Sequence, residues 1–91
     1  MYISGRERRI LEELLAYPDG LTVELLAQTL DVSTRTIHRD LKIVEDILTG
    51  YDLRLDKKSG TGIHITGSKE AKAKLDLALT QVAFTDYTPE E

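Results

Sequence analysis

The chain of 91 residues contains no cysteine. This absence excludes a disulfide framework and any metal site built on thiolates, and it fits a reducing compartment. No apolar run approaches the roughly 20 residues that a membrane-spanning helix requires. The first residues mix arginine with glutamate and do not lead into the apolar segment of a secretion signal. The sequence therefore predicts a cytoplasmic protein with no membrane partner.

Catalytic and cofactor-binding patterns are also lacking. His38 and His64 are the only histidines, and neither has a paired carboxylate at ligand spacing. A chain of this length forms one small domain and is too short to enclose a deep substrate pocket beside its core. We therefore expect no enzyme activity, no cofactor and no metal.

A positive net charge is missing as well, since the formal net charge is −4 and the pI is about 5.1. A free-standing DNA-binding domain is usually basic. Two segments depart from the acidic average, because residues 33–42 and residues 54–61 each carry a net charge of +2. Their charged residues are Arg35, Arg39, Lys42 and Asp40 in the first segment, and Arg54, Lys57, Lys58 and Asp56 in the second.

Residues 21–44 have the pattern of two short helices joined by a tight turn. Thr22 can cap a first helix, whose predicted buried stripe consists of Leu25, Leu26 and Leu30. A turn follows at Asp31 and Val32, and Ser33 can cap the second helix. The spacing predicts a helix-turn-helix.

The second helix has an apolar face and a cationic face. Its apolar residues recur at i, i+4, i+7 and i+11: Ile37, Leu41, Val44 and Leu48. The opposite face carries Arg35, Arg39, Lys42 and Asp46, with Thr36 and His38 at its flanks. Recognition helices contact base edges mainly with their N-terminal residues. We interpret Arg35, Thr36, His38, Arg39 and Lys42 as base-reading residues, and Ser33 and Thr34 as phosphate contacts. This segment alone fits an ordinary solvated face equally well.

After Thr49 and Gly50, where a helix is expected to stop, the apolar period falls to two. Leu53, Leu55, Ile63 and Ile65 alternate with polar residues and predict two half-buried strands around a glycine-containing loop. Such a hairpin after a helix-turn-helix is a wing. Its tip offers Lys57, Lys58 and Thr61 to phosphate oxygens. A hairpin that only closes the core is the alternative, and both interpretations can hold.

Two further helices are expected. Ser4 and Glu7 form a capping box before the stripe Ile10, Leu11, Leu14 and Leu15, which ends before Pro18. The first turns carry Arg6, Arg8 and Arg9, where the helix dipole is unfavourable to cations. Their partner is either phosphate or the glutamates Glu12 and Glu13.

The last helix spans 68–82, capped by Ser68. Its apolar stripe is Ala71, Leu75, Ala78, Leu79 and Val82. A partner surface for this stripe comes either from Ile43 and Ile47 of the same domain or from a second copy. Residues 83–91 have no period and are expected to form a linker or disordered tail.

Together these elements predict an α+β fold, a winged helix-turn-helix over residues 1–67 with a three-helix bundle, a two-stranded β-hairpin wing and an additional C-terminal helix. The expected function is sequence-specific binding of double-stranded DNA. Because the acidic balance weakens binding by one copy, a homodimer on paired half-sites is expected. The alternative is a winged-helix module for protein interaction or dimerisation that does not bind DNA.

Two strings, STRTIHRDL at 33–41 and GTGIHITG at 60–67, carry a resemblance. They resemble the N-terminal winged helix of bacterial transcriptional activators with phosphotransferase-system regulation domains, and the similarity covers residues 2–82. This resemblance implies a longer protein, whose downstream domains are phosphorylated by phosphotransferase-system proteins and control a sugar operon. Overall similarity favours a mannitol operon.

Overall fold

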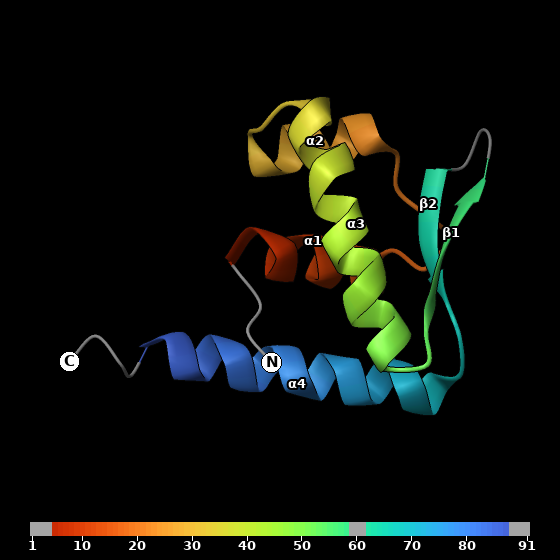
Figure 1. Cartoon of the computed structure of the whole chain (residues 1–91), viewed down its shortest axis with the longest axis vertical. Coiled ribbons are helices and arrows are strands. Elements are labelled where there is room, and N and C mark those ends of the chain that lie inside the picture. The colour runs from red at the N-terminus through yellow and green to blue at the C-terminus, as the bar shows by residue number, and fades with distance from the viewer. Residues whose placement is uncertain (1–4, 59–61, 88–91) are drawn as a thin grey trace.

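The computed structural model describes residues 5–58 and 62–87, with side chains described for 5–57 and 62–80. The described helices are α1 (Gly5–Ala16), α2 (Val23–Leu30), α3 (Thr34–Gly50) and α4 (Lys69–Tyr87). The described strands are β1 (Arg54–Lys58) and β2 (Gly62–Thr66). Figure 1 shows α3 crossing in front of α1, with α2 at one end, the hairpin at one side and α4 below. This arrangement confirms the predicted α+β winged helix-turn-helix.

Side-chain caps begin three of the helices at the predicted residues. The Thr22 hydroxyl accepts the backbone N–H of Leu25 at 3.1 Å, and the Ser33 hydroxyl accepts that of Thr36 at 3.2 Å. In α4 the Ser68 hydroxyl accepts the N–H of Ala71 at 3.0 Å. Each cap satisfies a donor that the first turn of a helix leaves free. The expected capping box at α1 includes Ser4, which lies outside the described residues.

The core forms where the helices meet the inner face of the hairpin. The predicted stripe of α3 is confirmed, since Ile37, Leu41, Val44 and Leu48 are all buried. The stripe predicted for α2 is partly wrong, because Leu25 is 46% exposed while Leu26 and Ala27 are buried. Successive residues of a helix point about 100° apart, so Leu25 and Ala27 are about 200° apart, and the side of α2 that faces the core is the one with Leu26 and Ala27.

Most of the described part of the apolar stripe of α4 is buried within this domain. Ala71, Leu75 and Leu79 are buried in the common core, and α4 packs on α1. Of the two isoleucines expected to receive it, Ile47 is buried and Ile43 remains 43% exposed. The helix also runs to Tyr87, beyond the expected end at Val82, so the linker predicted from residue 83 is helical for its first five residues. Residues 88–91 of that prediction lie outside the described residues.

The hairpin is antiparallel and pairs Leu55 with Ile65 and Asp56 with His64. The alternation is as predicted, with Ile63 and Ile65 buried and Leu55 partly buried. A contact that the sequence did not predict joins the hairpin to the loop after α1. Leu21 and Ile63 exchange two backbone hydrogen bonds of 2.8 and 2.7 Å. This bridge fixes the wing to the body of the domain.

Gly62 is required at this bridge. Its φ is +92°, and a Cβ atom there would lie 2.3 Å from the carbonyl oxygen of Leu21. A positive φ at a residue other than glycine costs about 1–3 kcal/mol, and the close approach to Leu21 adds to this cost. We therefore expect Gly62→Ala to destabilise the domain by about 1–3 kcal/mol or more. Urea unfolding measures the change. Gly50→Ala is the matched control, because its added Cβ would meet no atom within 4 Å apart from the adjoining backbone of its own helix. A loss at Gly62 no larger than that at Gly50 would contradict this prediction.

Candidate nucleic-acid interface

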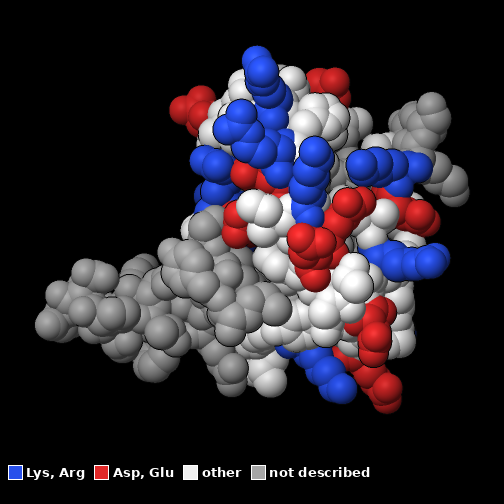
Figure 2. All heavy atoms as spheres, viewed as in Figure 1, with Lys and Arg blue, Asp and Glu red and all other residues white. Residues whose placement is uncertain are grey.

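The exposed face of α3 carries cations along its N-terminal half. Arg35, Arg39 and Lys42 are exposed, as is Asp46 one turn further on. Figure 2 shows Lys and Arg atoms gathered on the upper part of this face, where the N-terminal half of α3 lies in Figure 1. Helical spacing alone predicted this exposure, and the opposite face of α3 forms the core.

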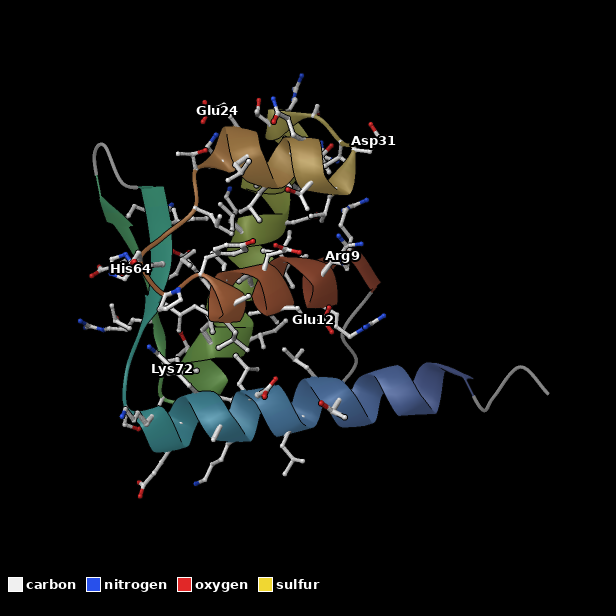
Figure 3. The ribbon with its side chains drawn as sticks, turned by 180° about the vertical axis from the view of Figure 1, so that it is seen from behind. Arg9, Glu12, Glu24, Asp31, His64 and Lys72 are labelled. Atoms are coloured by element: carbon white, nitrogen blue, oxygen red, sulfur yellow. The ribbon has the colours of Figure 1, made fainter. Side chains whose placement is uncertain are left out.

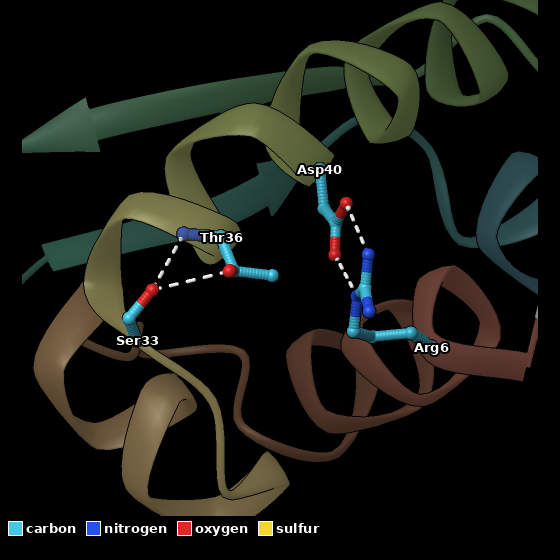
Figure 4. A network of polar contacts seen from close by, with 4 residues as sticks. All are labelled: Arg6, Ser33, Thr36 and Asp40. Carbon is cyan, nitrogen blue, oxygen red and sulfur yellow. Dashed lines mark hydrogen bonds and ion pairs between the residues drawn. The ribbon is translucent and has the colours of Figure 1, made fainter.

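Asp40 does not offset these cations in the way that its sequence position suggests. The residue is only 3% exposed. The Nε and Nη2 groups of Arg6 donate hydrogen bonds to its two carboxylate oxygens, with Nη2 3.2 Å from Oδ1 (Figure 4). This hydrogen bond, and then the carboxylate charge, raises the pKa of Arg6 above its ordinary value. The only acidic residue between Ser33 and Lys42 is therefore neutralised from α1.

The wing lies beside α3 in Figure 1. Arg54 and Lys57 are exposed on β1. Lys58 ends β1, but its side chain and all of Thr61 lie outside the described part of the chain. An open groove of about 470 Å³ lies elsewhere, between α1 and α4, and is lined by Glu12 and Lys72 among others (Figure 3).

Similarity to known proteins covers both the helix-turn-helix and the wing. The model of the helix-turn-helix (HTH) domain family matches residues 6–64, which run from α1 through the hairpin. The chain belongs to this family. It is also 38% identical over 86 residues to the "Transcriptional regulator ManR" of Bacillus subtilis (strain 168). That alignment covers 92% of the chain and 13% of the relative, so the chain spans a small part of that protein's length. No solved structure matches the chain.

Within this helix-turn-helix, two predicted contact residues bind each other. The Ser33 hydroxyl lies 3.1 Å from the Thr36 hydroxyl, in addition to capping its N–H group (Figure 4). Thr36 is partly buried, whereas Thr34 and His38 are exposed. The Thr36 hydroxyl thus already has a partner in Ser33. This contact stabilises the first turn of α3.

A second groove with an acidic lining lies at the other end of α3 from the exposed cations. A groove of about 350 Å³ between the C-terminal half of α3 and β1 is lined by Glu45, Asp46, Thr49, Arg54, Leu55 and Asp56. Three of these six residues are acidic. These carboxylates repel the negatively charged phosphates of DNA. DNA is therefore expected to contact the N-terminal half of α3.

The sequence offered either phosphate or nearby glutamates as partners for the arginines of α1. Two of these arginines form ion pairs with glutamates. Arg8 lies 3.2 Å from Glu12 and Arg9 lies 3.9 Å from Glu13, each one helical turn apart. Both arginines therefore have the glutamate partners that the sequence offered. Arg6 differs, because its partner Asp40 lies 34 positions away on another helix.

Neither histidine stands in a metal-binding cluster. Among the described residues, no group of three or more histidine, aspartate, glutamate or cysteine residues could hold a metal ion. His64 is partly buried on β2, with its Nε2 atom 3.8 Å from the carboxylate of Asp56. The helices in the described ranges are all too short or too polar to cross a membrane.

Proposed function

We propose that this chain binds double-stranded DNA in a sequence-specific manner, as the DNA-binding domain of a transcriptional regulator. The observation that carries this proposal is the exposed row Arg35, Arg39 and Lys42 on the second helix of a helix-turn-helix. A recognition helix enters the major groove with such a face. The B. subtilis relative is itself described as a transcriptional regulator.

The proposed contacts fall into two groups. The base-reading group lies on α3, where arginine can bond guanine O6 and N7 in the major groove; its members are Arg35, Thr36, His38, Arg39 and Lys42. The phosphate-binding group lies at the start of α3 and on the wing: Ser33, Thr34, Lys57, Lys58 and Thr61. Phosphate contacts position the domain and base contacts carry the sequence information.

We further propose that the regulated genes belong to a sugar phosphotransferase operon, with mannitol as the first sugar to test. The two strings at 33–41 and 60–67 support this, through their resemblance to activators of that class. Because the B. subtilis relative is much longer than this chain, there is room in such a protein for downstream domains that respond to phosphotransferase-system proteins. A homodimer on paired half-sites is the proposed binding form, since the net charge of −4 disfavours tight binding by one copy.

A protein-interaction module without DNA binding is the competing function. The exposed side chains of Ile43 and Leu77 favour it. In the sequence this alternative is favoured by the acidic balance and by the apolar stripe of α4. Three residues of that stripe, Ala71, Leu75 and Leu79, are buried inside the domain. An interaction module also has no need for cations on both α3 and the wing.

DNA binding is tested by the dependence of affinity on salt. With about four phosphate contacts per copy, we expect the logarithm of the association constant to fall with the logarithm of salt concentration with a slope of about −3 to −4. Electrophoretic mobility shift or fluorescence anisotropy at several salt concentrations measures it, using DNA from upstream of sugar-transport genes. The competing function predicts no complex at low salt, and a slope near zero would likewise exclude the proposed interface.

A further inference from the structure

One ion pair in this domain joins the interior to the proposed reading surface. Asp40 sits in the middle of α3, directly after Arg39, and is buried. Arg6 reaches it from the first turn of α1 with two N–H groups. A bidentate pair of this kind fixes the orientation of both side chains as well as their charge.

Removing Arg6 would leave a carboxylate unpaired beneath the cationic face. A buried charge without a partner lowers the stability of the fold. In such a variant the Asp40 carboxylate would be more stable if it turned toward water. Such a turn would bring a negative charge next to Arg39, where a phosphate or a guanine edge is to bind. Like charges facing each other across an interface reduce affinity strongly.

We propose that Arg6 is a positioning residue of the DNA interface, which holds the Asp40 carboxylate inside the domain and so keeps the turn around Arg39 free of negative charge. This inference rests on the proposed function. It adds α1 to the elements on which DNA recognition depends, although Arg6 is far from the recognition helix in sequence. The Arg6 side chain is itself 48% exposed, so direct contact with phosphate is the outcome that the test must separate.

A double-mutant cycle on the 91-residue chain makes this separation. We expect Arg6→Gln to weaken binding to the operator about tenfold. Adding Asp40→Asn to that variant removes the unpaired charge, and we expect affinity to return to within about threefold of wild type, with an unchanged salt slope. If Arg6 bound phosphate directly, the double variant would stay as weak as Arg6→Gln, and its slope would be smaller by about one. That result would overturn the proposal.

Arg8→Gln is the matched control, because Arg8 pairs with Glu12 of its own helix. We expect it to change operator affinity less than about twofold. Circular dichroism establishes that each variant is folded. If Arg6→Gln alone does not fold, Asp40→Asn decides: affinity at least equal to wild type supports the proposal, and weaker binding overturns it.

Failure of the proposal is distinct from failure of the proposed function. Wild-type protein that binds no duplex would reject both. Wild-type binding combined with an Arg6→Gln variant of unchanged affinity would reject only the role of Arg6.

Discussion

Leu41→Ala is expected to cost the domain about 2–5 kcal/mol of unfolding free energy. Leu41 is 3% exposed and lies in the inward stripe of α3. Truncating a buried leucine loses its transfer free energy and leaves a cavity. Small domains have only about 5–15 kcal/mol in total, and each kcal/mol corresponds to about 4–8 °C in Tm. Thermal melts should therefore show a Tm lowered by roughly 8 °C or more.

Two substitutions on the same helix serve as controls for Leu41→Ala. Ile43→Ala removes an aliphatic side chain of the same size that is 43% exposed, and we expect a clearly smaller loss. Arg39→Ala changes an exposed residue and should stay within about 0.5 kcal/mol of wild type. Equal losses in the three variants would mean that α3 is rotated about its axis, so that Leu41 does not face the core.

The sequence predicted the elements of this fold well where a strong period and a cap coincide. Ser33 caps α3, and the residues four and seven positions after Ile37 are buried as expected. The period of two likewise placed Ile63 and Ile65 inside. In these segments local propensity and burial favour the same structure, so a single sequence is sufficient.

Contacts between distant segments were not predictable in the same way. Asp40 lies at the border of the two faces of α3, and its partner Arg6 is 34 positions away on α1. The bridge between Leu21 and Ile63 forms because the backbones of two distant segments lie close together, and no pattern in either segment predicts this. The length of α4 was underestimated because residues 83–87 have no apolar period, although the helix continues through them.

The candidate interface shows the same division. Exposure of Arg35, Arg39 and Lys42 follows from helical spacing and was predicted. The neutralisation of Asp40 was not, and the sequence therefore understated the positive charge of the reading surface. An acidic protein can in this way present a locally cationic face. Salt screens electrostatic interactions beyond about a Debye length, so a phosphate interacts mainly with the charges closest to it.

Discrimination between DNA sequences is expected to depend on α3 and not on the wing. Arg39 can donate two hydrogen bonds to guanine O6 and N7, a contact worth about 1–3 kcal/mol against a wrong base. Arg39→Ala should therefore reduce the ratio of operator to scrambled-DNA affinity about 5- to 150-fold. Lys57 is exposed on β1 and is proposed to bind only phosphate. Lys57→Ala should weaken binding to both duplexes by similar factors, because phosphates are the same in every sequence.

Competition titrations with operator and scrambled duplexes at one salt concentration give both ratios directly. Arg39→Ala and Lys57→Ala each remove one positive charge, so the nonspecific loss is matched between them. A difference in the ratio then reports base reading alone. If Lys57→Ala lowers the ratio more than Arg39→Ala does, the wing is the reading element, and the proposed roles of α3 and the hairpin must be exchanged.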